Sequence, residues 1–198
     1  MRIKLIDLLN EHDGKLISGQ ITRRITAREG QDYVTSAKVL LPKAMINGCV
    51  DHSLLAEEKL IAQPDQERMT KEGDIVIKLS TPYDSVIISK EDEGILVTSF
   101  CAIIRGLDKD TSRYLTAYFN STEFNNLAKA STSGSIVIVL ALSFLKECYI
   151  PLPPKLEMIR LGDEYMRLLE MRKAFDEVYS LSKKKIDLTI TKYAKEDK

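Results

Sequence analysis

The C-terminal quarter of the sequence most constrains the fold, because a proline-rich corner there leads into a long helical pattern. The stretch "YIPLPPKLEMIR", from Tyr149 to Arg160, holds three of the chain's six prolines, and none follows Pro154. Proline fixes its own φ and keeps the preceding residue out of the α conformation, so the chain turns here at a defined angle. After this corner we expect a helix of about 35–40 residues, roughly 50–60 Å long.

The apolar residues of this segment recur at spacings of three and four, which predicts one apolar seam along the helix. The seam consists of Leu161, Tyr165, Leu168, Phe175, Tyr179 and Ile186. Arg172 and Ser182 interrupt it. A body of about 150 residues is too small to cover so long a helix, so we expect part of the seam to pack against a second helix, most simply in a homodimer. The alternative is a helix folded back along its own body.

Residues 1–150 predict an α+β body with a curled, mostly antiparallel β-sheet and peripheral helices. Strand patterns occupy Glu72–Ser80, the stretch from Ser85, and Ile95–Gly106, with turn signals between them. The residues around Tyr114–Asn120 switch to helical spacing, and the apolar stretch Ser135–Leu145 indicates buried structure. The chain thus divides into a body, residues 1–150, and a corner with its long helix, residues 151–198.

Composition excludes several classes of protein but does not identify the function. The chain has 29 basic and 29 acidic residues, which argues against a non-specific nucleic-acid coat but not against one basic face. The three cysteines are widely spaced and include no CxxC, as is typical of reduced cysteines in a cytosolic protein. We find no signal peptide, and the most apolar stretch is about half the length of a membrane span. We therefore expect a cytoplasmic protein that does not associate with membranes.

No pattern in the sequence supports catalysis. The only histidines are His12 and His52, and Asp51-His52-Ser53 cannot form a catalytic triad because neighbouring residues do not point at one another. The carboxylates and lysine of a nuclease motif occur in the wrong order, and no metal-ligand spacing or phosphate loop is present. We expect no catalytic residues, no metal and no cofactor, so a binding role leads. A small hydrolase using His52 is a third hypothesis, which an unchanged activity in His52→Ala would eliminate.

Three polar groups are candidates for binding DNA. Arginines close together in a loop or strand suit phosphates, and loops on a rigid sheet are common binding sites. For each group the alternative is an ordinary solvated surface that binds nothing, and the sequence does not decide between the two. The candidates are Arg23, Arg24 and Arg28; then Lys78, Ser80, Thr81 and Tyr83, where a strand breaks; then Lys129, Thr132, Ser133 and Gly134, around a polar loop.

The order of these elements resembles one half of the DNA-specificity subunit of type I restriction–modification systems. The resemblance covers nearly the whole chain, and the corner is its most similar part. The segments that carry it are Gly73-Asp74-Ile75-Val76 opening a strand, the Tyr114–Asn120 helix, Gly134-Ser135, and Ile150-Pro151-Leu152-Pro153-Pro154-x-x-Glu157 followed by Leu161.

The resemblance implies a target recognition domain that reads one half of a split site in double-stranded DNA, and a helix that serves as spacer. A two-fold dimer through the helices would supply two recognition domains. It also implies docking to methyltransferase subunits, which would carry S-adenosylmethionine, with a restriction subunit as a further candidate partner. The chain itself would be a non-enzymatic specificity subunit. The alternative is a protein-interaction or regulatory, antirestriction protein that assembles through its long helix.

Overall fold

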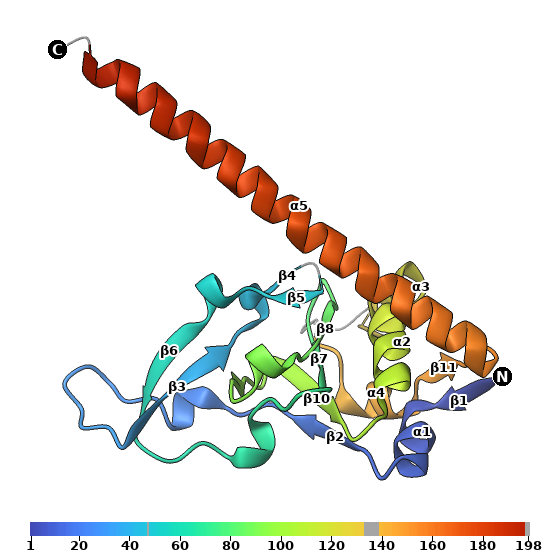
Figure 1. The fold of residues 1–198 in the computed structure, drawn as a ribbon. Coiled ribbons are helices and arrows are strands. Elements are labelled where there is room, and N and C mark those ends of the chain that lie inside the picture. The colour runs from blue at the N-terminus through green and yellow to red at the C-terminus, as the bar shows by residue number, and fades with distance from the viewer. Residues whose placement is uncertain (47, 133–138, 197–198) are drawn as a thin grey trace.

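The computed structural model describes residues 1–46, 48–132 and 139–196. Small sheets and short helices form a body from which one long helix projects (Figure 1). Short 3₁₀ turns are labelled η. The elements are β1 Arg2–Lys4, α1 Leu5–Glu11, β2 Lys15–Ser18, η1 Thr22–Arg24, β3 Thr35–Leu40, η2 Pro42–Ala44, β4 Met45–Ile46, β5 Cys49–Val50, η3 His52–Leu54, β6 Ala56–Leu60, η4 Gln66–Arg68, β7 Ile75–Lys78, β8 Ser85–Ile87, η5 Lys90–Asp92, β9 Leu96–Val97, β10 Cys101–Arg105, α2 Lys109–Phe119, α3 Thr122–Thr132, α4 Leu142–Glu147, β11 Tyr149–Pro151 and α5 Lys155–Glu196.

The central sheet has the strand order β2-β10-β7-β8, and all its pairs are antiparallel. Successive residues of a strand point to opposite faces. Accordingly Ile75 and Ile77 join the core beneath α1 and α2, while Val76 and Ile103 face a second core around Met45. A hydrophobic core lies against each face of the sheet, and its antiparallel pairing confirms the predicted α+β body with a mostly antiparallel sheet.

A second sheet, in the order β6-β3-β9, sits beside the first and includes one parallel pair, β3 with β9. The chain crosses between the two sheets at Gly19. A Cβ atom at Gly19 would lie 2.0 Å from the carbonyl oxygen of Thr98, so only glycine fits this crossing. The amide of Gln20 donates to the carbonyl oxygen of Val97 at 2.8 Å and continues the contact.

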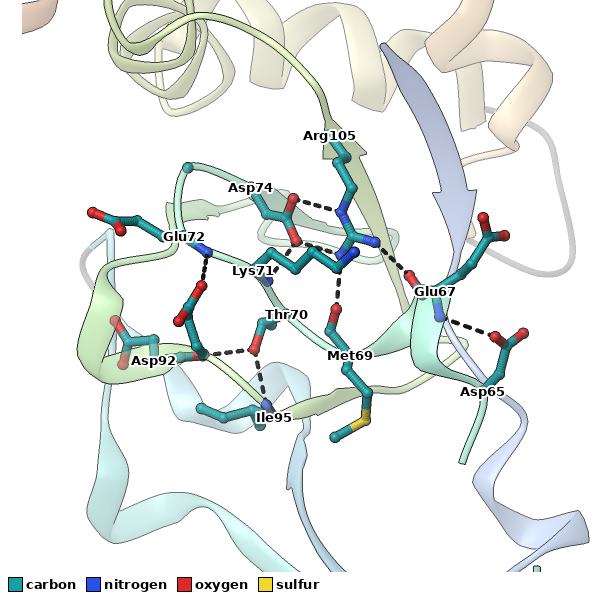
Figure 2. A network of polar contacts seen from close by, with 12 residues as sticks. Asp65, Glu67, Met69, Thr70, Lys71, Glu72, Asp74, Asp92, Ile95 and Arg105 are labelled. Carbon is teal, nitrogen blue, oxygen red and sulfur yellow. Dashed lines mark hydrogen bonds and ion pairs between the residues drawn. The ribbon is translucent and has the colours of Figure 1, made fainter. Parts of the chain in front are cut away.

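One buried ion pair fastens the segment that connects the two sheets (Figure 2). The guanidinium of Arg105 donates to both carboxylate oxygens of Asp74, at 2.8 Å and 2.6 Å. It also donates to the carbonyl oxygens of Glu67 and Met69, at 3.0 Å and 2.7 Å. The Asp74 side chain is 2% exposed, and it accepts a further bond from the amide of Lys71. Arg105 therefore ties the end of β10 to the connection that leads from β6 to β7.

The long C-terminal helix predicted from the corner is present as α5 and spans 42 residues. Its first turns belong to the body. Leu161 packs against the main core, and a Cβ atom at Gly162 would lie 3.0 Å from α2, at the backbone nitrogen of Tyr114. Arg113 of α2 forms an ion pair with Asp163. The two helices therefore run in close contact where α5 leaves the corner.

Further along α5, Tyr165 and Leu169 lie over Gly48, beside the β4–β5 hairpin. Burial raises the pKa of the Tyr165 phenol to about 12. Leu161 and Tyr165 are thus covered by the chain's own body and are not free for a second helix, unlike the rest of the predicted seam. Strand β11 pairs with β1, so the body extends past residue 150. The body also contacts α5 as far as Leu169, which is buried.

The direction of α5 should depend on its contact with α2 more than on the prolines. We expect Gly162→Leu to push α5 away from α2 and to shift the distance between spin labels at Lys90 and Lys184, because the added side chain meets backbone. The double change of Pro153 and Pro154 to glycine should leave that distance distribution nearly unchanged. A larger shift in the proline variant than in Gly162→Leu would show that the corner sets the direction.

Candidate nucleic-acid interface

Arg23, Arg24 and Arg28 surround one open hollow of about 470 Å³, here called the arginine hollow. Its remaining lining residues are Thr26, Glu29, Gly30, Gln31 and Ile61. All three arginines are exposed, and in the described parts of the chain none of them forms an ion pair with a carboxylate. Tertiary structure therefore brings the three predicted arginines together at one surface.

The backbone beneath the arginine hollow is held by hydrogen bonds to β6. The amide of Ala27 donates to the carbonyl oxygen of Lys59 at 2.8 Å, and the amide of Ile61 donates to that of Ile25 at 2.7 Å. The turn from Arg28 to Gln31 closes on itself, because the amide of Arg28 donates to the Gln31 side chain at 3.1 Å. A fixed backbone with exposed guanidinium groups suits an anion, since binding then orders only the side chains.

Exposed apolar and aromatic side chains accompany the arginines, and the sequence did not reveal them. Tyr33 and Val34, in the same loop, are 52% and 64% exposed. Lys59 of β6 places its ammonium 4.9 Å from the centre of the Tyr33 ring. Only the pairing of β3 with β6 brings Lys59 to this loop, so no local sequence signal could have identified it. A cationic surface with an exposed ring suits contact with both the backbone and the bases of a nucleic acid.

The strand-break group is largely inside the body, which corrects the prediction of a contact loop. Lys78 is 7% exposed, and its ammonium lies 2.7 Å from the Asp84 carboxylate. Tyr83 is fully buried, with its hydroxyl 3.1 Å from that of Thr132. These side chains hold the body together because their polar atoms already have partners in the interior. Thr81 is exposed, and Ser80 is partly exposed.

The third group does not join the arginine hollow. Thr132 is buried, Lys129 is exposed on α3, and Ser133 and Gly134 lie outside the described residues. Helix α3 and strand β6 lie on opposite sides of the body (Figure 1). The arginine hollow is thus the one predicted group whose members the structure gathers at a surface within the described ranges.

The described residues contain no cluster of three or more His, Cys, Asp or Glu that could hold a metal ion. His52 lies 2.7 Å from Asp92, while the Ser53 hydroxyl donates to Asp51 instead of facing the imidazole. The three adjacent residues Asp51, His52 and Ser53 therefore do not form a triad. Within the same described part of the chain, no helix is both long and apolar enough to cross a membrane.

Comparisons with known proteins reveal the fold but not a close relative. No family model and no curated protein matches the chain. A solved structure of a type I R-M system matches 95% of this chain and 46% of its own, with 16% identity and a TM-score of 0.60. The HsdS subunit from Thermoanaerobacter tengcongensis matches 90% of this chain and 39% of its own, with 14% identity and a TM-score of 0.53.

The S subunit of a type I restriction–modification system from M. genitalium gives a TM-score of 0.50 at 15% identity, over 92% of this chain and 42% of its own. The fold of this chain is therefore similar to that of type I S subunits. This chain, a body followed by a long helix, spans less than half the length of each matched structure.

Proposed function

We propose that this chain supplies DNA specificity to a type I restriction–modification system, with its body reading one half of a split site. The observation that carries the proposal is the arginine hollow, a cationic surface on the one fold unit that matches S subunits. Arginine forms paired hydrogen bonds with phosphate and with guanine, so three of them at one surface can both position and read a duplex.

The neutral net charge agrees with this division of labour. With 29 basic and 29 acidic residues, the chain has no general attraction for the phosphate backbone. The arginine hollow then acts locally, and the methyltransferase subunits would supply much of the remaining contact with phosphates. Those subunits would dock on the helices and would hold S-adenosylmethionine, so the chain itself acts as a binding component and not as an enzyme.

Co-expression tests the proposed function directly. The chain is produced together with the methyltransferase subunit of a type I system, and adenine methylation is mapped across the cell's DNA. We expect methylation at one split sequence whose two halves are inversely repeated, because two copies of one recognition domain read the same half-site twice. The matched control is the methyltransferase subunit alone, which should leave no such pattern. Failure to form a complex, together with an absence of site-specific methylation, would contradict the proposal.

The second candidate function is a regulatory or antirestriction protein that assembles through α5. The exposed apolar side of α5 favours it, because such a surface could bind the helices of a complete S subunit. The same co-expression experiment separates the two functions. A specificity subunit creates methylation in cells that lack an S subunit, whereas a regulator only lowers the methylation that an existing S subunit directs.

A further inference from the structure

Strands β3 and β6 carry an exposed polar face beside the arginine hollow. The two strands pair antiparallel, with Lys38 directly opposite Glu57. In the same register Ser36 lies opposite Lys59. Successive residues of a strand point to opposite faces, so these four side chains share one face, here called the ribbon face. All four are exposed, whereas Val39, on the other face of β3, is buried in a small core.

The ribbon face continues into the arginine hollow. Ile61 directly follows β6 and lines the hollow. Tyr33 comes from the loop before β3, and its ring lies beside the ammonium of Lys59. Both strands lie at the end of the body far from the N-terminus (Figure 1). A duplex whose phosphates meet the arginines can therefore present its base edges to the ribbon face.

One carboxylate, that of Glu57, stands among the cations of this surface. Phosphates repel carboxylates, so a surface that binds only the DNA backbone gains nothing from it. In the described parts of the chain neither Glu57 nor Lys38 forms an ion pair, although they lie directly opposite each other. The Glu57 carboxylate accepts one printed bond, from the Ser36 hydroxyl at 3.4 Å, and an ionised carboxylate has room for several. The ribbon face therefore offers both a donor and an acceptor to a ligand.

We propose that the ribbon face enters the major groove of DNA, where Lys38 and Glu57 together read one G·C base pair. Guanine presents the acceptors N7 and O6 in this groove, and cytosine presents its N4 amino donor beside them. Lysine donates to the guanine atoms, and a carboxylate accepts from the cytosine amino group. Directly opposite residues have Cβ atoms about 5 Å apart, so one side chain reaches each base of a single pair.

The shape of the sheet agrees with this placement. The major groove of B-DNA admits a two-stranded β-ribbon. Strand β9 joins β3 only at Val39 and Leu40, so ahead of these residues β6 is the one strand paired with β3 in the described part of the chain. The proposal rests on the proposed function, because it names a base pair that the recognition domain reads.

The variant Glu57→Gln tests the reading in the co-expression experiment. Glutamine has nearly the same shape as glutamate, but its amide pairs with N6 and N7 of adenine. We expect the unchanged chain to direct methylation to a site with a cytosine in each half. The variant should accept adenine at that one position and keep the others. An identical methylated sequence for the two chains would overturn the proposal.

The matched control is Glu58→Gln. Glu58 is the next residue of β6, and its side chain points to the opposite face of the strand. The control should therefore leave the methylated sequence unchanged. The same relaxation in Glu58→Gln as in Glu57→Gln would show that the effect does not come from the ribbon face.

A base analogue tests the groove with the purified complex. The guanine paired with that cytosine is replaced by 7-deazaguanine, which lacks the N7 acceptor of the major groove. Affinity, measured by fluorescence anisotropy, should fall about tenfold, as expected for a lost base contact. Lys38→Ala should bind the two duplexes equally, because its contact with N7 is already absent. Equal binding of both duplexes by the unchanged chain, or the same tenfold loss in Lys38→Ala, would overturn the reading.

Failure of this reading and failure of the proposed function give different results. Absence of site-specific methylation with the unchanged chain would remove the DNA role and this reading together. Methylation at a fixed site that neither Glu57→Gln nor 7-deazaguanine affects would retain the DNA role and remove Lys38 and Glu57 as readers. If Glu57→Gln and Lys38→Ala instead prevented co-purification with the methyltransferase subunit, the ribbon face would be a protein contact, which also overturns the reading.

Discussion

Replacing Arg105 with methionine is expected to lower the free energy of unfolding by about 3–5 kcal/mol. The change leaves the Asp74 carboxylate, which is 2% exposed, without its counter-charge. The carbonyl oxygens of Glu67 and Met69 lose their donors as well (Figure 2). Urea denaturation followed by circular dichroism measures the effect.

The matched control for this prediction is Arg160→Met. Arg160 also has two carboxylates at 2.6 Å, from Glu157 and Glu164, but its side chain is 53% exposed. Exposed pairs add little to stability because water solvates the charges in the unfolded and folded states alike. We expect almost no change in the control. Adding Asp74→Asn to Arg105→Met should recover part of the loss, since no buried charge then remains. If Arg105→Met and Arg160→Met destabilised the protein equally, the buried ion pair of Arg105 with Asp74 would have no special role in stability.

Changing Arg23, Arg24 and Arg28 together to alanine is expected to weaken DNA binding by the assembled complex on all sequences at low salt. The plot of log affinity against log salt should become shallower by about 3, because each lost phosphate contact removes about one unit of slope. Fluorescence anisotropy with a labelled duplex across a salt series measures both quantities. An unchanged slope would remove the arginine hollow from the DNA interface.

Two controls accompany the arginine variants. Arg2→Ala removes an exposed arginine from β1, at the end of the body far from β6 (Figure 1), and should leave the slope unchanged. The triple change to lysine keeps the three charges but loses the paired geometry of the guanidinium group. If the arginines only bind phosphate, the lysine variant should keep the slope. If they also read bases, it should keep the slope and lose preference for the methylated sequence.

Local features of the sequence were enough to predict several of the elements. The apolar run Ile75-Val76-Ile77 after the Gly73-Asp74 turn predicted a strand, and helical spacing at Tyr114 and Tyr118 predicted α2. Both signals lie within a few neighbouring residues, so they do not depend on where the element packs. The corner and α5 were predicted for the same reason, since proline acts on its immediate neighbours.

The candidate site was predictable only in part. Arg23, Arg24 and Arg28 are close in sequence, so a single loop could gather them. Tyr83 carried the same polar signal as a surface residue, yet it is buried against Thr132, which lies 49 positions away. Lys59 joined the site through strand pairing. The presence of polar residues in a loop does not show whether their side chains point to solvent or to the interior, because that direction depends on packing against distant segments.

The sequence alone determined that this chain would have an antiparallel α+β body and one helix too long for that body to cover. Tertiary structure decided which part of the helix is free. Leu161 and Leu168 have the same place in the seven-residue repeat, but only Leu161 packs against the main core, so Leu168 and the residues from Glu170 onward remain open to a partner. Helical periodicity places apolar residues on one side of a helix, while their burial depends on where the neighbouring elements end.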